Sequence, residues 1–232
     1  MYIFEDIGLI EYKHAWDYQE KCFNEIIDTK LYNRDHNGEQ KEVVNRLIFC
    51  EHPHVYTLGK SGAQNNLLIN DEFLKKINAT YFKTNRGGDI TYHGPGQIVG
   101  YPILDLEELG LGVKEYIRDL EESIIRLLKD YGIESTRMDG ATGVWLDADK
   151  PGKARKICAI GVKVSRYVTM HGFAFNVNTD LTYFNHINPC GFVDKGVTSL
   201  EKELGEKQDF EKIKKELKKH IDYVFKVDFR KQ

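Results

Sequence analysis

Strand-like and helix-like segments follow one another in clusters along this sequence, and their order restricts the possible folds. β-branched segments predict strands at residues 43–50, 80–84, 98–104, 143–147, 156–165 and 168–178. Apolar residues at helical spacing predict helices at 113–131, at 210–224 and, more weakly, at 15–27. A doubly wound fold would alternate more regularly and would carry a G-x-G-x-x-G turn after its first strand, which is absent here. We therefore expect a mixed β-sheet packed with helices, of class α/β or α+β.

The size and charge of the chain limit its domain count and its partners. At 232 residues with 41% hydrophobic residues, we expect a single domain over 1–232. A net charge of -3 argues against a general nucleic-acid binder, which needs an excess of Lys and Arg. No apolar run approaches the ~20 residues of a membrane span. The first residues resemble neither a signal nor a transit peptide, so a cytoplasmic location is expected.

A glycine-rich segment at 86–97, RGGDITYHGPGQ, is the first candidate for a functional site. Four glycines in twelve residues let the backbone approach a ligand closely. A tight surface turn is the alternative, but such a turn has little use for Arg86, His93 and Gln97 as well. We interpret the segment as part of a binding site.

Two neighbouring strands carry the next candidates. Strict alternation along 156–165 places Lys156 on the same side as Cys158, Ile160, Val162 and Val164, at the head of an otherwise apolar row. A lysine in such a row snorkels to water, pairs with a carboxylate, or serves in a site. The small residues Gly172 and Ala174 could line an apolar slot, although ordinary sheet packing explains them equally well.

The cysteine usage separates one thiol from the others. The four cysteines show neither a C-x-x-C pair nor zinc spacing, so we expect free thiols and no metal site. Cys190 follows Pro189 and precedes Gly191, which is turn chemistry, whereas Cys22, Cys50 and Cys158 fall in apolar surroundings. A search for a nucleophile therefore ranks Cys190 first and Cys158 a distant second.

Three stretches together resemble a known family. RGGDITYHGPGQ, RKICAIGVKVSRYVTMHGFAFNVN and INPCG…GVTSL resemble the lipoyl(octanoyl) transferases. The resemblance covers about 42–200 and implies the fold of the biotin/lipoate protein ligase catalytic domain, which is akin to class II aminoacyl-tRNA synthetases. It implies that 1–232 is a single catalytic domain, with the ligase- or transferase-like core at about 42–227. It also implies the reaction: an octanoyl or lipoyl group moves from acyl carrier protein to a specific lysine of a lipoyl domain, in the first step of protein lipoylation.

The resemblance assigns roles to individual residues. Cys190 is the implied acyl-accepting nucleophile, and Lys156 the implied group that lowers its pKa. The implied substrate-binding residues are Arg86, Gly87, Gly88, Asp89, Ile90, Thr91, Tyr92, His93, Ala159, Ile160, Gly161, Gly172, Phe173 and Ala174. The implied acceptors are the lipoyl domains of 2-oxo acid dehydrogenase complexes and the glycine cleavage H protein. We expect no cofactor and a monomeric enzyme.

Elementary electrostatics supports the pairing of Lys156 with Cys190. A thiol with a pKa of about 8.5 is only a few per cent thiolate at neutral pH, and reaching about 7 costs roughly 2 kcal/mol. One ammonium within about 4 Å supplies about 4 kcal/mol at an effective dielectric near 20. A general-acid role for His93 and a purely orienting role remain equal alternatives. A separate hypothesis is a basic docking cluster, made of Lys150, Lys153, Arg155 and Arg166.

Two other functions compete with acyl transfer. An ATP-dependent lipoate or biotin protein ligase would share the fold, but it forms an adenylate and needs no cysteine nucleophile. A non-catalytic module that binds lipoyl domains would be marked by loss of Lys156 or Cys190, and both residues are present. Acyl transfer is the preferred interpretation.

Overall fold

Two β-sheets and five α-helices make up the described part of this chain. The computed structural model describes residues 1–36, 38–188 and 195–231. The larger sheet has the order β10-β8-β9-β6-β2-β1-β11, and β7 also pairs with β8. Its strands are β1 (Tyr2–Leu9), β2 (Asn45–Glu51), β6 (Gln97–Ile103), β7 (Gly143–Leu146), β8 (Arg155–Ser165), β9 (Val168–Asn176), β10 (Gly196–Val197) and β11 (Arg230–Lys231).

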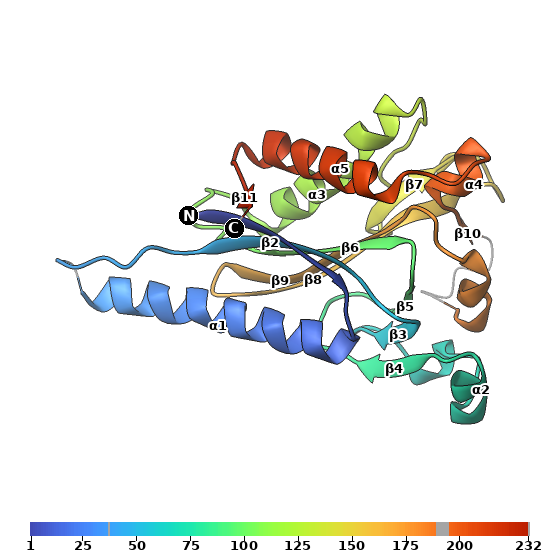
Figure 1. Ribbon diagram of the computed structural model, residues 1–232, viewed down its shortest axis with the longest axis horizontal. Helices are drawn as coiled ribbons and strands as arrows, with labels where there is room; N and C mark the ends of the chain where they lie inside the picture. Colours follow the sequence, from blue (N-terminus) through green and yellow to red (C-terminus); the bar gives the residue numbers. More distant parts are fainter. Residues whose placement is uncertain (37, 189–194, 232) are drawn as a thin grey trace.

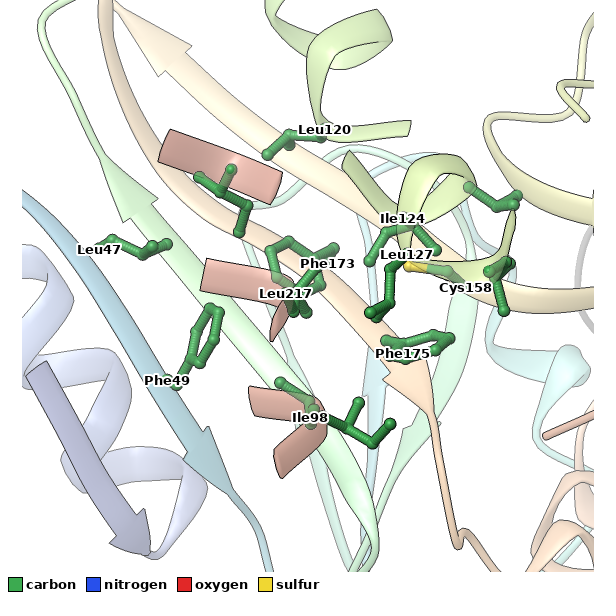
Figure 2. Packing of buried hydrophobic residues seen from close by; sticks show 14 of the residues in the cluster. Leu47, Phe49, Ile98, Leu120, Ile124, Leu127, Cys158, Phe173, Phe175 and Leu217 are labelled. Atoms are coloured by element: carbon green, nitrogen blue, oxygen red, sulfur yellow. The ribbon is translucent and has the colours of Figure 1, made fainter. Parts of the chain in front are cut away.

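Helices cover both faces of the larger sheet, as Figure 1 shows. On one face lies α1 (Tyr12–Asp35), and on the other lie α3 (Val113–Asp130) and α5 (Phe210–Phe225). The main core forms beneath α3 and α5, where Leu120, Ile124 and Leu217 pack on Phe173 and other side chains of the sheet (Figure 2). Burying each such side chain contributes about 1.5–3 kcal/mol.

The smaller sheet has the order β4-β3-β5 and lies beyond the start of α1. It contains β3 (Val55–Leu58), β4 (Thr80–Lys83) and β5 (Ile90–His93). Short helices flank these strands: η1 (Gln64–Asn66), α2 (Asp71–Lys76) and η2 (Leu181–His186), whereas α4 (Leu200–Leu204) packs on the main core of the larger sheet through Leu200. Asn70 accepts a hydrogen bond from the Phe73 amide at 2.9 Å, so it is the expected N-cap of α2.

The predicted strands and helices are present, and the boundaries differ by a few residues. The hairpin expected between 156–165 and 168–178 is β8–β9, and its two-residue turn is Arg166 and Tyr167. Both residues have positive φ, 51° and 61°, as a type I′ turn requires at its two central positions. Helix α1 is longer than the predicted 15–27 and extends to Asp35.

A β-bulge in β8 overturns the strict alternation expected for this strand. Val144 of β7 pairs with Cys158 and Trp145 pairs with Lys156, so Ile157 has no partner of its own on β7. The extra residue changes which face each side chain occupies. Ile157 and Cys158 both enter the main core, whereas Lys156 lies against the Trp145 ring on the opposite face. The prediction that Lys156 shares its side with Cys158 is therefore wrong.

Candidate active site

A cavity of about 380 Å³ lies between the two sheets, within the size range of small-molecule sites. Its walls bring together segments that are far apart in the sequence. Of the predicted residues, those that line it are Lys156, Arg86, Gly87, Gly88, Asp89, Ile90, Thr91, His93, Ala159, Ile160, Gly161, Gly172, Phe173 and Ala174. The glycine-rich segment and the β8–β9 hairpin therefore belong to one cavity.

Tyr92 is the one predicted substrate-binding residue that is not among the lining residues. Its neighbours Thr91 and His93 line the cavity, while Tyr92 is fully buried in the separate cluster of the smaller sheet. Its hydroxyl lies 2.7 Å from Nδ1 of His54, and its ring stacks on Tyr183 at 5.0 Å. In the structure, Tyr92 thus supports the strand behind the cavity.

Small residues form the cavity floor along β8 and β9. Ala159 pairs with Ala174, and Gly161 pairs with Gly172, so two successive rows carry almost no side chain. We call these four residues the trough. Val99 of β6 lies beside Ala174 and extends the trough sideways. Such a floor leaves room for an extended apolar chain.

The glycine-rich segment covers the trough and is bonded to the edge of β8. The Gly87 amide donates to the Val162 carbonyl at 2.8 Å. A Cβ atom on Gly161 would lie 2.9 Å from the Gly87 carbonyl oxygen, below any normal contact distance. Gly88 has φ +82°, a conformation that side chains rarely adopt. Glycine is therefore needed here for the close approach of two backbone segments, and the expected close approach to a ligand stays a prediction.

Lys156 lies at one end of the trough. Its Nζ donates to the Thr142 carbonyl at 3.1 Å and lies 4.7 Å from the centre of the Trp145 ring. Val197 of β10 pairs with Lys156, and the Thr198 amide donates to the Lys156 carbonyl at 2.9 Å. The backbone of Lys156 is thereby held on both sides, by β7 and by β10.

Three of the four cysteines are unsuited to be nucleophiles. Cys22, Cys50 and Cys158 are each at most 2% exposed, and burial raises the pKa of all three thiols. Figure 2 shows the Cys158 sulfur within the main core, beside Leu127. The low rank given to these cysteines agrees with the structure. The preferred nucleophile, Cys190, lies outside the described residues.

The described residues on either side of 189–194 are attached near the cavity. Upstream, the Asn188 amide donates to the Asn66 carbonyl at 2.8 Å. Downstream, Lys195, Gly196 and Val197 all line the cavity, and Val197 pairs with Lys156. The described residues on the two sides of 189–194 are thus bonded to η1 and to Lys156.

Several lining residues escaped the sequence analysis. They are Tyr12, Val99, Tyr101, Ile117, Gly140, Ala141, Thr142, Trp145, Val162, His171, Asn176, Phe184, Lys195, Gly196 and Val197. Tyr12, Tyr101 and His171 close the end of the trough opposite Lys156. His171 has φ +61° in the middle of β9, a backbone state that no local pattern indicates. Asn176 could have been predicted, because it lies two residues after Ala174 on the same strand and therefore faces the same side.

The basic cluster expected beside Lys156 is not a single patch. Arg155 forms ion pairs with Asp147 and with Glu203, the second at 2.7 Å. Lys150 is also paired with Asp147, at 2.5 Å. Arg166 lies at the tip of the β8–β9 hairpin, the full length of β8 away from Arg155. The docking hypothesis based on this cluster is wrong in that form, because intramolecular carboxylates already engage part of it.

Buried neutral histidines behind the trough predict acid sensitivity of the fold. Burial lowers the pKa of His52 from 6.5 to about 4. Its Nδ1 bonds to the Ile10 carbonyl and its Nε2 to the Tyr101 hydroxyl, each at 2.7 Å, so the neutral ring has both nitrogens paired in the buried site. The contribution of the neutral His52 to the free energy of unfolding is complete above pH 6.5 and is lost as the pH falls through about 4. The reason is that the unfolded chain, in which this histidine has its ordinary pKa, binds the proton more readily than the folded chain.

We expect this histidine alone to remove about 3 kcal/mol of unfolding free energy over that interval. Urea unfolding at a series of pH values measures the loss. The variant His52→Asn is expected to be less stable at neutral pH and to depend less on pH. A wild-type stability that stays constant down to about pH 4.5 would contradict the assignment.

The described part of the chain offers no cluster of three or more His, Cys, Asp or Glu side chains fit to hold a metal ion. Among the same residues, no helix is long and apolar enough to cross a membrane.

Comparison with known proteins now tests the expected family. The lipoyl protein ligase A/B catalytic domain family matches residues 11–222. The chain belongs to this family. An octanoyltransferase of Cytophaga hutchinsonii is 55% identical over 224 residues, which are 96% of this chain and 92% of the relative. An octanoyltransferase of Bacteroides fragilis is 56% identical over 216 residues, 93% and 94% of the two chains.

The fold is also found in solved structures. A bipartite lipoate protein ligase from Thermoplasma acidophilum matches with a TM-score of 0.68 at 13% identity, covering 99% of this chain and 86% of that one. At such low identity the likeness concerns the fold alone. The expected ligase-like fold, the transferase family and the acyltransferase class are thereby confirmed.

Proposed function

We propose that this enzyme moves an octanoyl group from octanoyl-acyl carrier protein to a lysine of a lipoyl domain, through a thioester on Cys190. The octanoyltransferase relatives support the acyl group and the reaction class. The acceptors we propose are the lipoyl domains of 2-oxo acid dehydrogenase complexes and the glycine cleavage H protein. We further propose that it works as a monomer, because both sheets that enclose the cavity belong to one chain.

One observation carries the proposal: the trough ends at Lys156, beside the strand that follows the Cys190 segment. Adjacent rows of the trough are separated by two residues, roughly 6.6 Å. From Lys156 to Gly161 the strand therefore advances about 13–16 Å. An extended octanoyl chain, with seven C–C bonds of about 1.5 Å in a zigzag, needs about 9 Å. The chain fits with its carbonyl near Lys156 and its methyl end near Tyr101.

The proposed reaction has two balanced steps. The Cys190 thiolate attacks the donor thioester, the carbon–sulfur bond to the carrier's prosthetic thiol breaks, and the thiolate that leaves takes up the proton that Lys156 gives up. The acceptor lysine, as a free amine, then attacks the Cys190 thioester. An amide bond forms, the Cys190–carbon bond breaks, and Lys156 receives the proton that the amine loses.

Mass spectrometry of the intact protein tests the proposal. Mixed with octanoyl-acyl carrier protein and no ATP, the enzyme is expected to gain one octanoyl group. No adduct, together with adenylate formation from free octanoate and ATP, would instead establish the ligase function.

The trough also predicts the preferred chain length. Ala174→Leu fills the middle of the trough, because Ala174 is buried opposite Ala159. We expect octanoyl transfer to fall at least about tenfold, and butanoyl transfer to fall less than about threefold. Val164→Leu, on the other face of β8, is the matched control and is expected to leave the preference unchanged. Equal losses for both acyl groups in Ala174→Leu would show that the trough does not hold the chain.

A further inference from the structure

A continuous line of buried polar groups crosses the interior from one sheet to the other. Its members are, in order, Arg86, Thr57, His93, Gln97, Asn176 and Thr198. At its start, Nη2 of Arg86 lies 2.9 Å from Oγ1 of Thr57, which lies 3.4 Å from Nε2 of His93. The line therefore begins in the glycine-rich segment over the trough and enters β5.

The second half of the line crosses the larger sheet. Nδ1 of His93 lies 2.9 Å from Oε1 of Gln97 on β6. Nε2 of Gln97 donates to Oδ1 of Asn176 on β9 at 2.9 Å, and Nδ2 of Asn176 donates to the Thr198 carbonyl at 3.0 Å. All of these residues are at most 7% exposed. Buried polar side chains of this kind are retained at low cost only when their partners are in place.

Backbone carbonyls fix the direction of every bond in the line. The Thr198 carbonyl can only accept, so the Asn176 amide group faces it and the Asn176 oxygen must accept from Gln97. Gln97 also donates to the Tyr92 carbonyl at 3.2 Å, which orients the Gln97 oxygen towards His93. His93 is then the donor through Nδ1.

The same logic settles the state of His93. Burial lowers its pKa well below the usual value, so the ring is neutral and carries one proton. Because that proton is on Nδ1, Nε2 has only a lone pair, and the Thr57 hydroxyl donates to it. A neutral ring whose only proton is already given to Gln97 is not a general acid. Of the two roles left open by the sequence, orientation is the one that this geometry supports.

The line ends where Lys156 is held. Thr198 receives the Asn176 hydrogen bond on its carbonyl, and its own amide donates to the Lys156 carbonyl at 2.9 Å. Val197, one residue earlier, pairs with Lys156 across β10 and β8. Asn176 thus fixes the chain that pairs with Lys156, and Gln97 fixes Asn176.

We propose that Gln97 and Asn176 are positioning residues that couple the glycine-rich segment over the trough to the Lys156 strand pair. The proposal rests on the proposed function, in which Lys156 acts on the acyl group. Neither amide needs to touch the substrate. Each acts by keeping Thr198, and with it the backbone of Lys156, in register with the segment that covers the acyl chain.

A matched pair of asparagines tests the proposal. Asn176→Leu removes one accepted and one donated hydrogen bond. Asn178→Leu, two residues along, also removes one of each, but its partner is Gln208, with bonds of 2.9 Å in both directions. The measurements are amide exchange at Thr198, the melting temperature, and kcat and KM for octanoyl transfer.

We expect the melting temperature of both variants to fall by about 2–4 °C for each kcal/mol of unfolding free energy that is lost. Only Asn176→Leu is expected to speed Thr198 exchange and to lower kcat, each about tenfold, with KM changed less than about threefold. Unchanged Thr198 exchange, equal acceleration in Asn178→Leu, or an unaltered kcat would each overturn the proposal. A wild-type enzyme that transfers no octanoyl group would refute the proposed function instead. Amide exchange at Thr198 in the variants would then still test whether Asn176 positions Thr198.

Asn176→Asp covers the case in which the leucine variant does not fold. Its carboxylate can still accept from Gln97, but only the protonated acid can donate to the Thr198 carbonyl. Burial favours the acid form. We expect the ratio of its kcat to that of the wild type to rise as the pH falls. The other titratable groups on this line, His93 and the Glu203 that accepts from the Thr198 hydroxyl, are common to both enzymes. A ratio independent of pH would contradict the proposal.

Discussion

Replacing the proposed nucleophile, Cys190→Ala, is expected to lower octanoyl transfer by at least about 1000-fold. Removing a covalent nucleophile leaves only binding and orientation to accelerate the reaction. The steady-state rate with octanoyl-acyl carrier protein and a lipoyl domain measures the loss. The same variant is expected to show no octanoyl adduct in its intact mass.

Cys158→Ala is the matched control for this substitution. Cys158 is fully buried in the main core, and burial raises the pKa of its thiol. We expect its replacement to leave transfer within about tenfold of the wild type, with some loss of stability from the cavity that it creates. Full activity in Cys190→Ala, or an octanoyl group found on Cys158, would refute the assignment.

Lys156 is expected to affect both half-reactions, in opposite protonation states. We propose that in the free enzyme its ammonium stabilises the Cys190 thiolate. Acylation converts that thiolate into a neutral thioester, after which Lys156 can give up its proton and accept one from the acceptor amine. Lys156→Met should therefore slow alkylation of Cys190 about tenfold near neutral pH, and should also slow deacylation. The rate of Cys190 alkylation, followed in samples quenched at set times, measures the first effect. Single-turnover transfer from the preformed acyl-enzyme to a lipoyl domain measures the second.

Lys156→Arg separates the two roles of the lysine. Guanidinium keeps its charge, so this variant should restore alkylation better than deacylation. Lys163→Met provides a matched control, because Lys163 lies on the same strand with its Nζ 4.6 Å from the Phe23 ring, much as Lys156 lies over Trp145. We expect the control to retain both half-reactions. If Lys156→Arg deacylates at the wild-type rate, Lys156 serves only as a fixed charge.

Local periodicity was sufficient to locate the three long helices and six of the eleven strands in the described residues. The buried stripe of Tyr116, Leu120 and Ile124 is a property of one segment, and the helix begins at the predicted residue, Val113. Strand β1 was missed, because only Ile3 of its residues is buried and pairing with β2 and β11 is what makes it a strand. The sequence of one segment alone does not show which distant segment it pairs with.

The site shows the same division between local and non-local information. The small residues Gly172 and Ala174 were noted from their own segment as a possible slot, and both line the cavity. Ala159 and Gly161 were expected only from the family resemblance, and they line it too. The face of Lys156 was not predictable, because the bulge that sets it depends on the register of β7 against β8. Tyr92 was included because the resemblance implied the whole range 86–93, and in the structure it packs in the cluster of the smaller sheet.

Isolation of the acyl-enzyme tests the central claim most directly. The enzyme is loaded from octanoyl-acyl carrier protein, freed from the carrier, mapped by peptide mass spectrometry, and then mixed with a lipoyl domain without ATP. We predict that the octanoyl group is on Cys190 and moves to a single lysine of the lipoyl domain at least as fast as kcat. An octanoyl group elsewhere, or one on Cys190 that does not reach the lipoyl domain at that rate, would contradict the account.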